Sequence, residues 1–269
     1  MTTSNKTDII IFGGQSNMQG QSEVLTECEV VEGALEYRFL TDTLKPLCNP
    51  VGEDIRYDGS AGYRFDDGVM LGEWVADHVL ASACYGHTNL VPSFVRAYIK
   101  ETGKNVIAVP AAKGSTNIES WLPSSPGYRA LASKAAAAIK KASETYDIER
   151  IYIVWLQGES DAIESVSKAC YKERLMTVAE SLKADLGIER FGVIRVGRYN
   201  FDKRDDEIIS AQDEICRESP LFLMLTDIAT TLNEDATMMN PYVPGHYSAL
   251  GLETLGTAAG TALGKHRAE

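Results

Sequence analysis

Three short polar turns in the sequence carry the residue types that acyl transfer needs. Each turn directly follows an apolar run, and the turns read GGQSNM at Gly13–Met18, KGSTNI at Lys113–Ile118 and QGESD at Gln157–Asp161. A serine becomes a nucleophile when a neighbouring base takes its proton. Backbone and amide N–H groups can then stabilise the oxyanion that forms on the attacked carbonyl. The three turns together are therefore a candidate site for nucleophilic chemistry.

Ser16 is the candidate nucleophile, because it lies on a turn that leads from an expected strand into an expected helix, where its backbone N–H is free. The chain has four histidines, at His78, His87, His246 and His266. Only His246 falls in a tight Gly-containing turn at the expected carboxyl edge of the sheet, so it is the candidate base. Gly114 and Gln157 are then candidate oxyanion donors, and Glu159 is the candidate carboxylate that orients the imidazolium.

The Gly-Gly-x-Ser turn has a second interpretation, because such a turn can also hold a phosphate. Taken alone, the turn favours a nucleophile and an anion site equally. The G-x-G-x-x-G and G-x-x-x-x-G-K-[ST] patterns are absent, which lowers the case for a nucleotide. The G-x-S-x-G turn of α/β-hydrolases is absent too, because Met18 stands where its last glycine belongs.

The elements that must position these turns alternate between apolar runs and helical patterns. Five runs are expected as buried strands, at Asp8–Gly13, Asn105–Pro110, Arg150–Leu156, Phe191–Gly197 and Leu221–Thr226. Helices are expected at Leu90–Thr102, Tyr128–Tyr146, Lys168–Leu186 and Asp205–Glu218, with a last one from near Ser248. Nearly continuous apolar strands are typical of parallel sheets that are covered on both faces. The pattern predicts a three-layer α/β domain with right-handed crossovers.

One domain spanning residues 1–269 is expected, with one interruption. Residues 19–89 break the alternation and contain a Gly- and Asp-rich stretch and one expected helix near Val69–Ser82. A connection this long is usually functional, so we expect it to wall the active site. In the last helix, Gly251, Gly256 and Gly260 predict close packing against a neighbour.

Composition and charge exclude several classes of partner. The chain of 269 residues has 26 Lys and Arg against 38 Asp and Glu, a net charge of −12. A general nucleic-acid binder needs clustered cations, so nucleic acid is not expected as a partner. No run is long enough to cross a membrane. Five widely spaced cysteines without a C-x-x-C pair argue against a disulfide framework or a zinc site, which favours a cytoplasmic setting. A leader removed from this chain stays an alternative.

The three blocks together resemble a known family. GQSNMQG at Gly14–Gly20, KGSTNIESW at Lys113–Trp121 and WLQGESD at Trp155–Asp161 are similar to blocks of the SGNH-hydrolase superfamily. The likeness is greatest to its branch of sialate O-acetylesterases and family 6 carbohydrate esterases, which act on acetylated xylan. It runs over roughly residues 8–262. The resemblance implies a flavodoxin-like sheet in the order 2-1-3-4-5 and serine esterase chemistry without a metal or cofactor.

Carried over block by block, the resemblance makes Ser16 the nucleophile and His246 the general base. The N–H groups of Ser16 and Gly114 and the amide of Gln157 would form the oxyanion hole. Three positions depart from the family pattern: Ser115 replaces a second glycine, Leu156 replaces a common histidine, and Val243 replaces the aspartate that often lies three residues before the histidine.

The departure at Val243 leaves the acid member of the triad open. Glu159 is the first choice, a Ser–His dyad is the second, and a more distant carboxylate such as Asp235 is the third.

Asn17, Asn117 and Trp121 are candidate substrate-binding residues, although a tryptophan more often packs in a core. The expected partner is an oligosaccharide or small-molecule acetyl ester. The competing hypotheses are an esterase or thioesterase for a non-sugar acyl group and an inactive sugar-binding relative. Oligomeric state is not readable from the sequence.

Overall fold

Among the described residues, the central sheet has seven strands in the order β3-β2-β6-β1-β7-β8-β9. The computed structural model describes residues 6–24, 29–53, 55–58, 62–65 and 88–268. The strands of the sheet are β1 (Lys6–Gly14), β2 (Ala34–Arg38), β3 (Thr43–Pro46), β6 (Asn105–Ala112), β7 (Asp147–Leu156), β8 (Arg190–Ile194) and β9 (Phe222–Thr226). All neighbours pair in parallel except β3, which runs antiparallel to β2 at the edge.

The five expected strands are β1, β6, β7, β8 and β9, and their order confirms the implied 2-1-3-4-5 arrangement. The expected count of five was wrong, because β2 and β3 extend the sheet beyond β6. These two strands are short and carry charged residues, so they lack the continuous apolar run that marks a buried strand. The missed strands come from the 19–89 segment, which thus contributes to the sheet as well as to the site.

Buried ion pairs explain how charged residues fit into this edge. Glu36 of β2 is fully buried and pairs with Arg38 at 3.0 Å. Farther along, Glu53 pairs with Lys134 of the helix α4 at 2.9 Å, and both side chains are buried. Removing one partner of such a pair would leave an uncompensated buried charge, which is strongly destabilising. The Glu53–Lys134 pair therefore joins this segment to α4.

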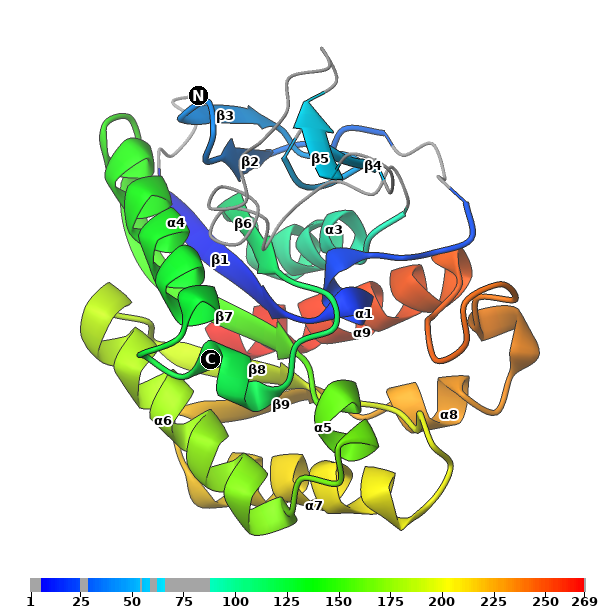
Figure 1. Cartoon of the computed structure of the whole chain (residues 1–269). Helices are drawn as coiled ribbons and strands as arrows, with labels where there is room; N and C mark the ends of the chain where they lie inside the picture. The colour runs from blue at the N-terminus through cyan, green and yellow to red at the C-terminus, as the bar shows by residue number, and fades with distance from the viewer. Residues whose placement is uncertain (1–5, 25–28, 54, 59–61, 66–87, 269) are drawn as a thin grey trace.

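Helices cover both faces of the sheet (Figure 1). One face carries α3 (Val91–Thr102) and α9 (Ala249–Ala268), and the other carries α4 (Pro126–Ser143), α6 (Lys168–Leu186) and α7 (Lys203–Glu218). Shorter elements are α1 (Ser16–Gln19), η1 (Ile118–Trp121), α5 (Glu159–Ile163), α8 (Ala229–Leu232), η2 (Ala236–Met238) and the separate antiparallel pair β4 (Ile55–Asp58) and β5 (Gly62–Phe65). The predicted three-layer architecture is confirmed.

The expected close packing of the last helix is confirmed where α9 lies against α3. A Cβ atom at Gly260 would come within 2.1 Å of the Phe94 carbonyl oxygen, and one at Gly256 within 2.2 Å of the Ser93 hydroxyl. Only a residue without a side chain allows the two backbones to approach this closely. The glycines thus fix the distance between the two helices.

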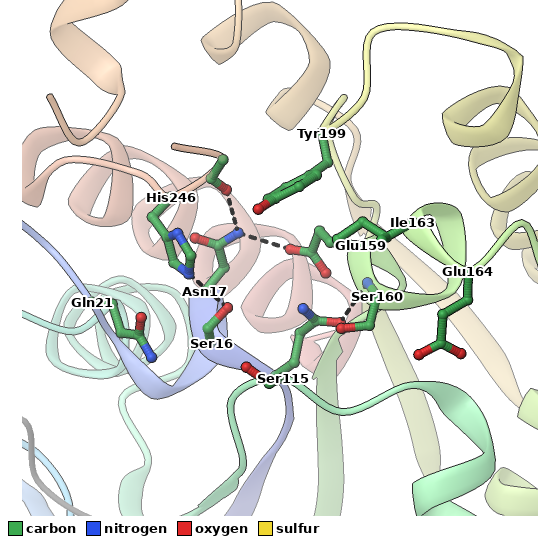
Figure 2. Close-up of a pocket in the computed structure, with 12 residues that line it drawn as sticks. Ser16, Asn17, Gln21, Ser115, Glu159, Ser160, Ile163, Glu164, Tyr199 and His246 are labelled. Carbon is green, nitrogen blue, oxygen red and sulfur yellow. Dashed lines mark hydrogen bonds between the residues drawn. The ribbon is translucent and has the colours of Figure 1, made fainter. Parts of the chain in front are cut away.

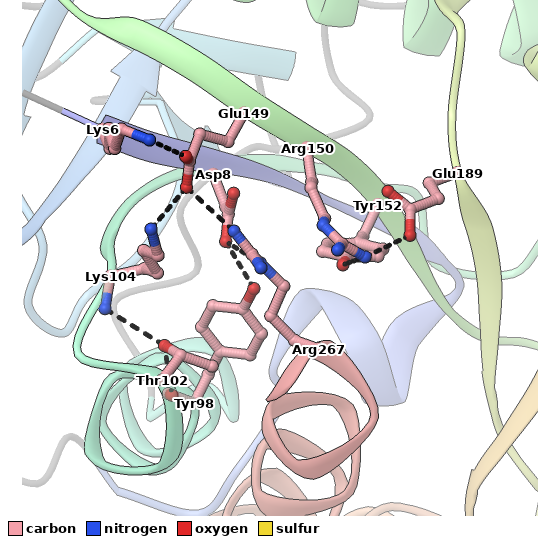
Figure 3. A network of polar contacts seen from close by, with 10 residues as sticks. All are labelled: Lys6, Asp8, Tyr98, Thr102, Lys104, Glu149, Arg150, Tyr152, Glu189 and Arg267. Atoms are coloured by element: carbon pink, nitrogen blue, oxygen red, sulfur yellow. Dashed lines mark hydrogen bonds and ion pairs between the residues drawn. The ribbon is translucent and has the colours of Figure 1, made fainter. Parts of the chain in front are cut away.

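A polar network holds the amino end of β1 to the end of α9 (Figure 3). Asp8 is fully buried and accepts hydrogen bonds from the Tyr98 hydroxyl at 2.6 Å and from Arg267 Nε at 3.1 Å. Arg267 also contacts Glu149 at 2.9 Å, and Lys104 and Lys6 bind the same carboxylate. The hydrogen bonds from Lys104 and Lys6 lower the pKa of Glu149 to about 2. The network lies at the sheet edge opposite to the three polar turns.

The helix expected near Val69–Ser82 lies outside the described residues. Two described residues of the 19–89 segment contact the chain on either side of the His246 loop. The Gln21 carbonyl accepts a hydrogen bond from Asn240, and the Glu23 carboxylate accepts one from the Ala249 N–H. Within the described part of the chain, no helix is long and apolar enough to span a membrane.

Candidate active site

A cavity of about 290 Å³ opens at the carboxyl edge of the sheet (Figure 2). Its wall is made by residues that follow strands β1, β6, β7 and β8 and by the loop before α9. The lining residues are Gln15, Ser16, Asn17, Gln21, Ser115, Glu159, Ser160, Ile163, Glu164, Tyr199, Gly245 and His246. The carboxyl edge is where parallel sheets bind their ligands, and the topology brings the three polar turns together there as the sequence predicts.

Ser16 and His246 lie in hydrogen-bond contact in this cavity. The Ser16 Oγ atom is 2.8 Å from His246 Nε2, and His246 Nδ1 is 3.0 Å from the Pro244 carbonyl oxygen. A carbonyl oxygen can only accept, so Nδ1 carries the proton and donates it to Pro244. In the neutral ring, Nε2 then has a free lone pair directed at the serine hydroxyl. This tautomer suits a general base for Ser16.

The loop that carries His246 has a backbone shape that requires glycine beside it. Gly245 has a φ of +75°, in the left-handed region. A Cβ atom there would lie 1.9 Å from the Tyr199 ring. The aromatic ring therefore packs against the backbone next to the histidine, and a side chain at 245 would push the loop away from Ser16.

Asn17 connects the nucleophile turn to this loop and to Glu159. Its Nδ2 donates to Glu159 Oε1 at 2.8 Å and to the Gly245 carbonyl at 3.2 Å. Its Oδ1 accepts from the Tyr247 N–H at 3.2 Å. One amide group thus holds the peptide groups on both sides of His246. Asn17 is 3% exposed, so its side chain supports the site from behind rather than presenting free groups to a substrate.

Glu159 approaches the site without a hydrogen bond to His246. Its Oε1 is used by Asn17, and its Oε2 is buried with no hydrogen-bond partner among the described residues. Burial raises the pKa of this carboxyl above its usual value. The expected direct contact with the imidazole is therefore replaced by an indirect one, because the Pro244 carbonyl occupies Nδ1. Asp235, the alternative acid, instead caps η2 through the Thr237 N–H.

The two further candidate oxyanion donors are engaged elsewhere. The Gly114 N–H donates to Gln19 Oε1 at 2.7 Å. Gln157 is fully buried, and its Nε2 donates to Asp161 Oδ2 and, at 3.1 Å, to the Thr116 carbonyl. Burial raises the pKa of Asp161 to about 6. The Ser16 N–H begins α1 and has no acceptor among the described residues.

The remaining candidate residues support the walls. Trp121 is 1% exposed and packs edge-on against Trp155, with ring centroids 5.4 Å apart, so its burial favours the core interpretation. Asn117 caps η1 by accepting from the Ser120 N–H, and its Nδ2 donates to Glu164. Ser115 adopts a φ of +58°, which is the strained conformation expected where the family pattern has glycine.

Sequence reasoning missed six side chains that line the cavity: Gln15, Gln21, Ser160, Ile163, Glu164 and Tyr199. Gln15 and Ser160 lie inside the quoted blocks next to the candidate residues, so their position was a usable signal. Gln21 and Tyr199 lie in loops, and their approach depends on packing that no local pattern encodes. Within the described residues, no group of three His, Cys, Asp or Glu side chains is placed to hold a metal ion.

Solved structures share the fold at low sequence identity. A protein from Arabidopsis thaliana is 16% identical with a TM-score of 0.61, covering 97% of this chain and 98% of that one. NanS is 14% identical with a TM-score of 0.64, covering 100% of both chains. A structure described as a novel carbohydrate acetylesterase from Xanthomonas citri is 14% identical with a TM-score of 0.55, covering 95% of this chain and 55% of that one. No curated protein sequence matches the chain.

The comparison with protein families identifies the chain more specifically than the similarity of fold does. Residues 6–259 match the family described as carbohydrate esterase, sialic acid-specific acetylesterase. The match runs from β1 into α9 and so includes all three polar turns and the loop of His246. With that coverage, and with a serine and a histidine in contact at the carboxyl edge of the parallel sheet, the chain belongs to the sialic acid-specific acetylesterase family of carbohydrate esterases.

Proposed function

We propose that this protein removes O-acetyl groups from carbohydrates as a serine esterase, through an acetyl-enzyme intermediate. The observation that carries the proposal is the 2.8 Å contact between Ser16 Oγ and His246 Nε2, with the imidazole tautomer set by the Pro244 carbonyl. Family membership supports the acetylated-sugar substrate. The hydroxyl and amide groups that line the cavity suit a ligand rich in hydroxyls.

In the proposed reaction, Ser16 Oγ attacks the acetyl carbonyl while His246 Nε2 takes the serine proton. The carbonyl electrons move onto oxygen, where N–H donors stabilise the negative charge. His246 then gives its proton to the departing sugar hydroxyl, and the acetyl group remains on Ser16. Water repeats the sequence and releases acetate.

His246 works here without a carboxylate on Nδ1. The Pro244 carbonyl orients the ring and accepts the Nδ1 proton. The negative charge of Glu159 acts on the imidazolium from beyond Asn17, which both holds that carboxylate and braces the loop. We therefore assign Glu159 and Asn17 as positioning residues and Ser16 and His246 as the reacting pair.

The test is acetate release from acetylated xylo-oligosaccharides, an O-acetylated sialic acid and 4-nitrophenyl acetate, with Ser16→Ala measured alongside. We expect the wild-type protein to release acetate and Ser16→Ala to lose that activity while its melting temperature stays close to wild type. Ser143→Ala, on the exposed surface of α4, is the matched control and keeps full activity.

Two outcomes would contradict the proposal. If Ser16→Ala still hydrolysed acetyl esters, Ser16 would not be the nucleophile. Binding of an acetylated oligosaccharide without any acetate release would instead establish the inactive sugar-binding alternative. A series of nitrophenyl esters of increasing chain length separates the remaining alternative, since a preference for long acyl groups indicates a non-sugar substrate.

A further inference from the structure

The loop between β8 and α7 exposes a large aromatic side chain at the rim of the cavity. Phe201 is 64% exposed, whereas Tyr199, two residues earlier, lines the cavity. Phe201 is not among the lining residues, so it lies outside the cavity, and two residues of chain span at most about 7 Å. Single exposed apolar side chains are common on protein surfaces, so exposure alone gives Phe201 no function.

The backbone at Phe201 adopts a conformation that is unusual for an aromatic residue. Its φ is +58°, in the left-handed region. In the part of the chain that the structure describes, the other residues with a side chain and a positive φ are Asp42, Ser115 and Ser165, which are all small and polar. A bulky residue in this region is an outlier, and residues held in such conformations cluster at sites that bind ligands.

A buried carboxylate keeps the loop in this conformation. Asp205 is 1% exposed, and it accepts hydrogen bonds from the backbone N–H groups of Tyr199 at 3.2 Å, Asn200 at 3.0 Å and Asp202 at 3.3 Å. It also accepts from Asn200 Nδ2 at 3.1 Å. The two carboxylate oxygens thus bind the chain on both sides of Phe201. The loop cannot relax to an ordinary φ at Phe201 without losing some of these bonds.

The same loop is continuous with the catalytic cavity through Tyr199. The Tyr199 ring packs against Gly245, next to His246 (Figure 2). The cavity has a volume of about 290 Å³, which is at the low end of the range of roughly 300–1,000 Å³ for small-molecule sites. It therefore has room for one acetylated sugar unit, and a second unit linked to the first must lie outside, on the rim where Phe201 stands.

The chemistry of the cavity wall and of the rim favours a carbohydrate over an acyl chain. Ile163 is the only aliphatic side chain among the described residues that line the cavity, and the others carry mostly hydroxyl, amide and carboxylate groups. A long acyl chain needs a continuous apolar groove instead. A pyranose ring presents C–H bonds on its faces and hydroxyls around its edge. The electron-rich face of an aromatic ring attracts those C–H groups, while the hydroxyls stay in water.

We propose that Phe201 forms a second sugar subsite, on which the unit linked to the acetylated one stacks. The substrate is then an acetylated oligosaccharide or glycoside rather than a free monosaccharide. The inference rests on the proposed function. The acetylated unit occupies the cavity between Tyr199 and Ser16, and its neighbour lies against the Phe201 ring. Because this contact is remote from the reacting atoms, it changes which substrate is preferred and leaves the chemistry at Ser16 unchanged.

The test compares substrates that differ only in the number of sugar units. One pair is a methyl mono-O-acetyl-xyloside and a methyl xylotrioside with the same acetyl group on its central unit. The other pair is an O-acetylated sialic acid and the same sugar linked to lactose. For the pair on which the enzyme is more active, we expect kcat/KM to be about five- to tenfold higher for the longer substrate, the order of magnitude of one aromatic stacking contact.

Phe201→Asn separates a subsite from a merely structural role. Asparagine tolerates the left-handed region and has no aromatic face, so the melting temperature should stay the same or rise while the kcat/KM ratio falls toward one. The rates with the single-unit substrate and with 4-nitrophenyl acetate should stay within about twofold of wild type, because neither reaches the rim. Phe201→Trp keeps an aromatic face and should keep the ratio.

Val30→Ala is the matched control. Val30 is another exposed apolar side chain, 56% exposed and close to the amino end of β2, away from the catalytic edge. Its substitution should leave both the ratio and the individual rates unchanged.

The outcomes separate this inference from the proposed function. A ratio that survives in Phe201→Asn, or a wild-type ratio near one for both pairs, would overturn the subsite alone, provided that acetate release is lost in Ser16→Ala. An equal loss of activity on 4-nitrophenyl acetate would show that Phe201 supports the catalytic residues instead. Self-association that disappears in Phe201→Asn while the ratio stays would assign the ring to an interface between copies. No acetate release from any substrate would overturn both proposals.

Discussion

Asn17 performs through one amide the task that a carboxylate beside the histidine often performs. It holds the Gly245 carbonyl and the Tyr247 N–H, the peptide groups on either side of His246, and it also binds Glu159. Because Asn17 is adjacent to Ser16, the same short segment of the chain positions both the nucleophile and the base. The His246 ring can therefore be held in place although Val243 stands where the family pattern has an aspartate.

This arrangement predicts different costs for two substitutions. Asn17→Ala removes all three contacts, so we expect kcat/KM to fall by about 100-fold or more, as for other losses of positioning. Glu159→Gln keeps an oxygen that accepts from Asn17 Nδ2 and loses only the charge, so we expect a fall of less than about tenfold. Steady-state rates with 4-nitrophenyl acetate test the ranking.

A larger loss in Glu159→Gln than in Asn17→Ala would contradict the ranking and would show that the charge of Glu159 acts on the imidazolium directly. The pH profile of kcat/KM separates the two effects. A lost charge shifts the profile of Glu159→Gln, whereas a displaced loop in Asn17→Ala lowers the rate at every pH.

At the scale of the elements, α3 and α9 pack closely against each other on one face of the sheet. The glycine side of α9 meets backbone atoms of α3, and backbone atoms cannot rotate away as side chains can. The loop of His246 leads directly into α9. The helix therefore connects the packing of the rear layer to the position of the base.

Gly260→Ala should destabilise the protein by about 1–3 kcal/mol, because its Cβ would overlap the Phe94 carbonyl and force the helices apart. Thr257→Ala, on the exposed side of the same helix, is the matched control and should change stability by less than about 0.5 kcal/mol. Urea unfolding measures both. Equal stability of the two variants would show that the helices have room to separate.

The elements show where sequence reasoning succeeds. The expected bounds of α6 agree with the structure, because a regular apolar spacing ends at Gly187, which adopts a left-handed cap. The strands β2 and β3 were missed, because they are short and carry charged residues such as Glu36 and Arg38, which pair with each other inside the fold instead of forming an apolar run. In the site, the contact of Ser16 with His246 follows from two local motifs. The side chain of Gln15, which lines the cavity, accepts hydrogen bonds from the N–H groups of Gly158 and Ser160, and only the assembled sheet decides where those groups point.

At the scale of the molecule, charge favours one kind of substrate. The chain carries a net charge of −12, and the charged side chains among the described residues that line the cavity are the carboxylates Glu159 and Glu164. An anionic sugar entering this cavity meets repulsion, whereas a neutral one does not. The charges of the described lining residues thus support the prediction that uncharged acetyl esters are the better substrates.

We therefore expect the methyl ester of an O-acetylated sialic acid to be deacetylated with a higher kcat/KM than the free acid, by about fivefold, since charges several ångströms apart near a surface repel by about 1 kcal/mol. The ratio should fall toward one at high salt. Glu164→Gln, at an exposed wall position, should also lower it. A preference for the free acid would show that a cation elsewhere in the chain binds the carboxylate.

The network in Figure 3 brings the start of β1 and the end of α9 to the same place in the molecule. Lys6 at the start of β1 and Arg267 at the end of α9 bind the same carboxylate of Glu149. A short linker between these ends would complete a ring, and the chain could then be cut in an exposed loop far from the catalytic edge without altering the order of the layers. Circular permutants made in this way would keep the Ser16–His246 pair, which offers a route to display the enzyme from a new pair of ends.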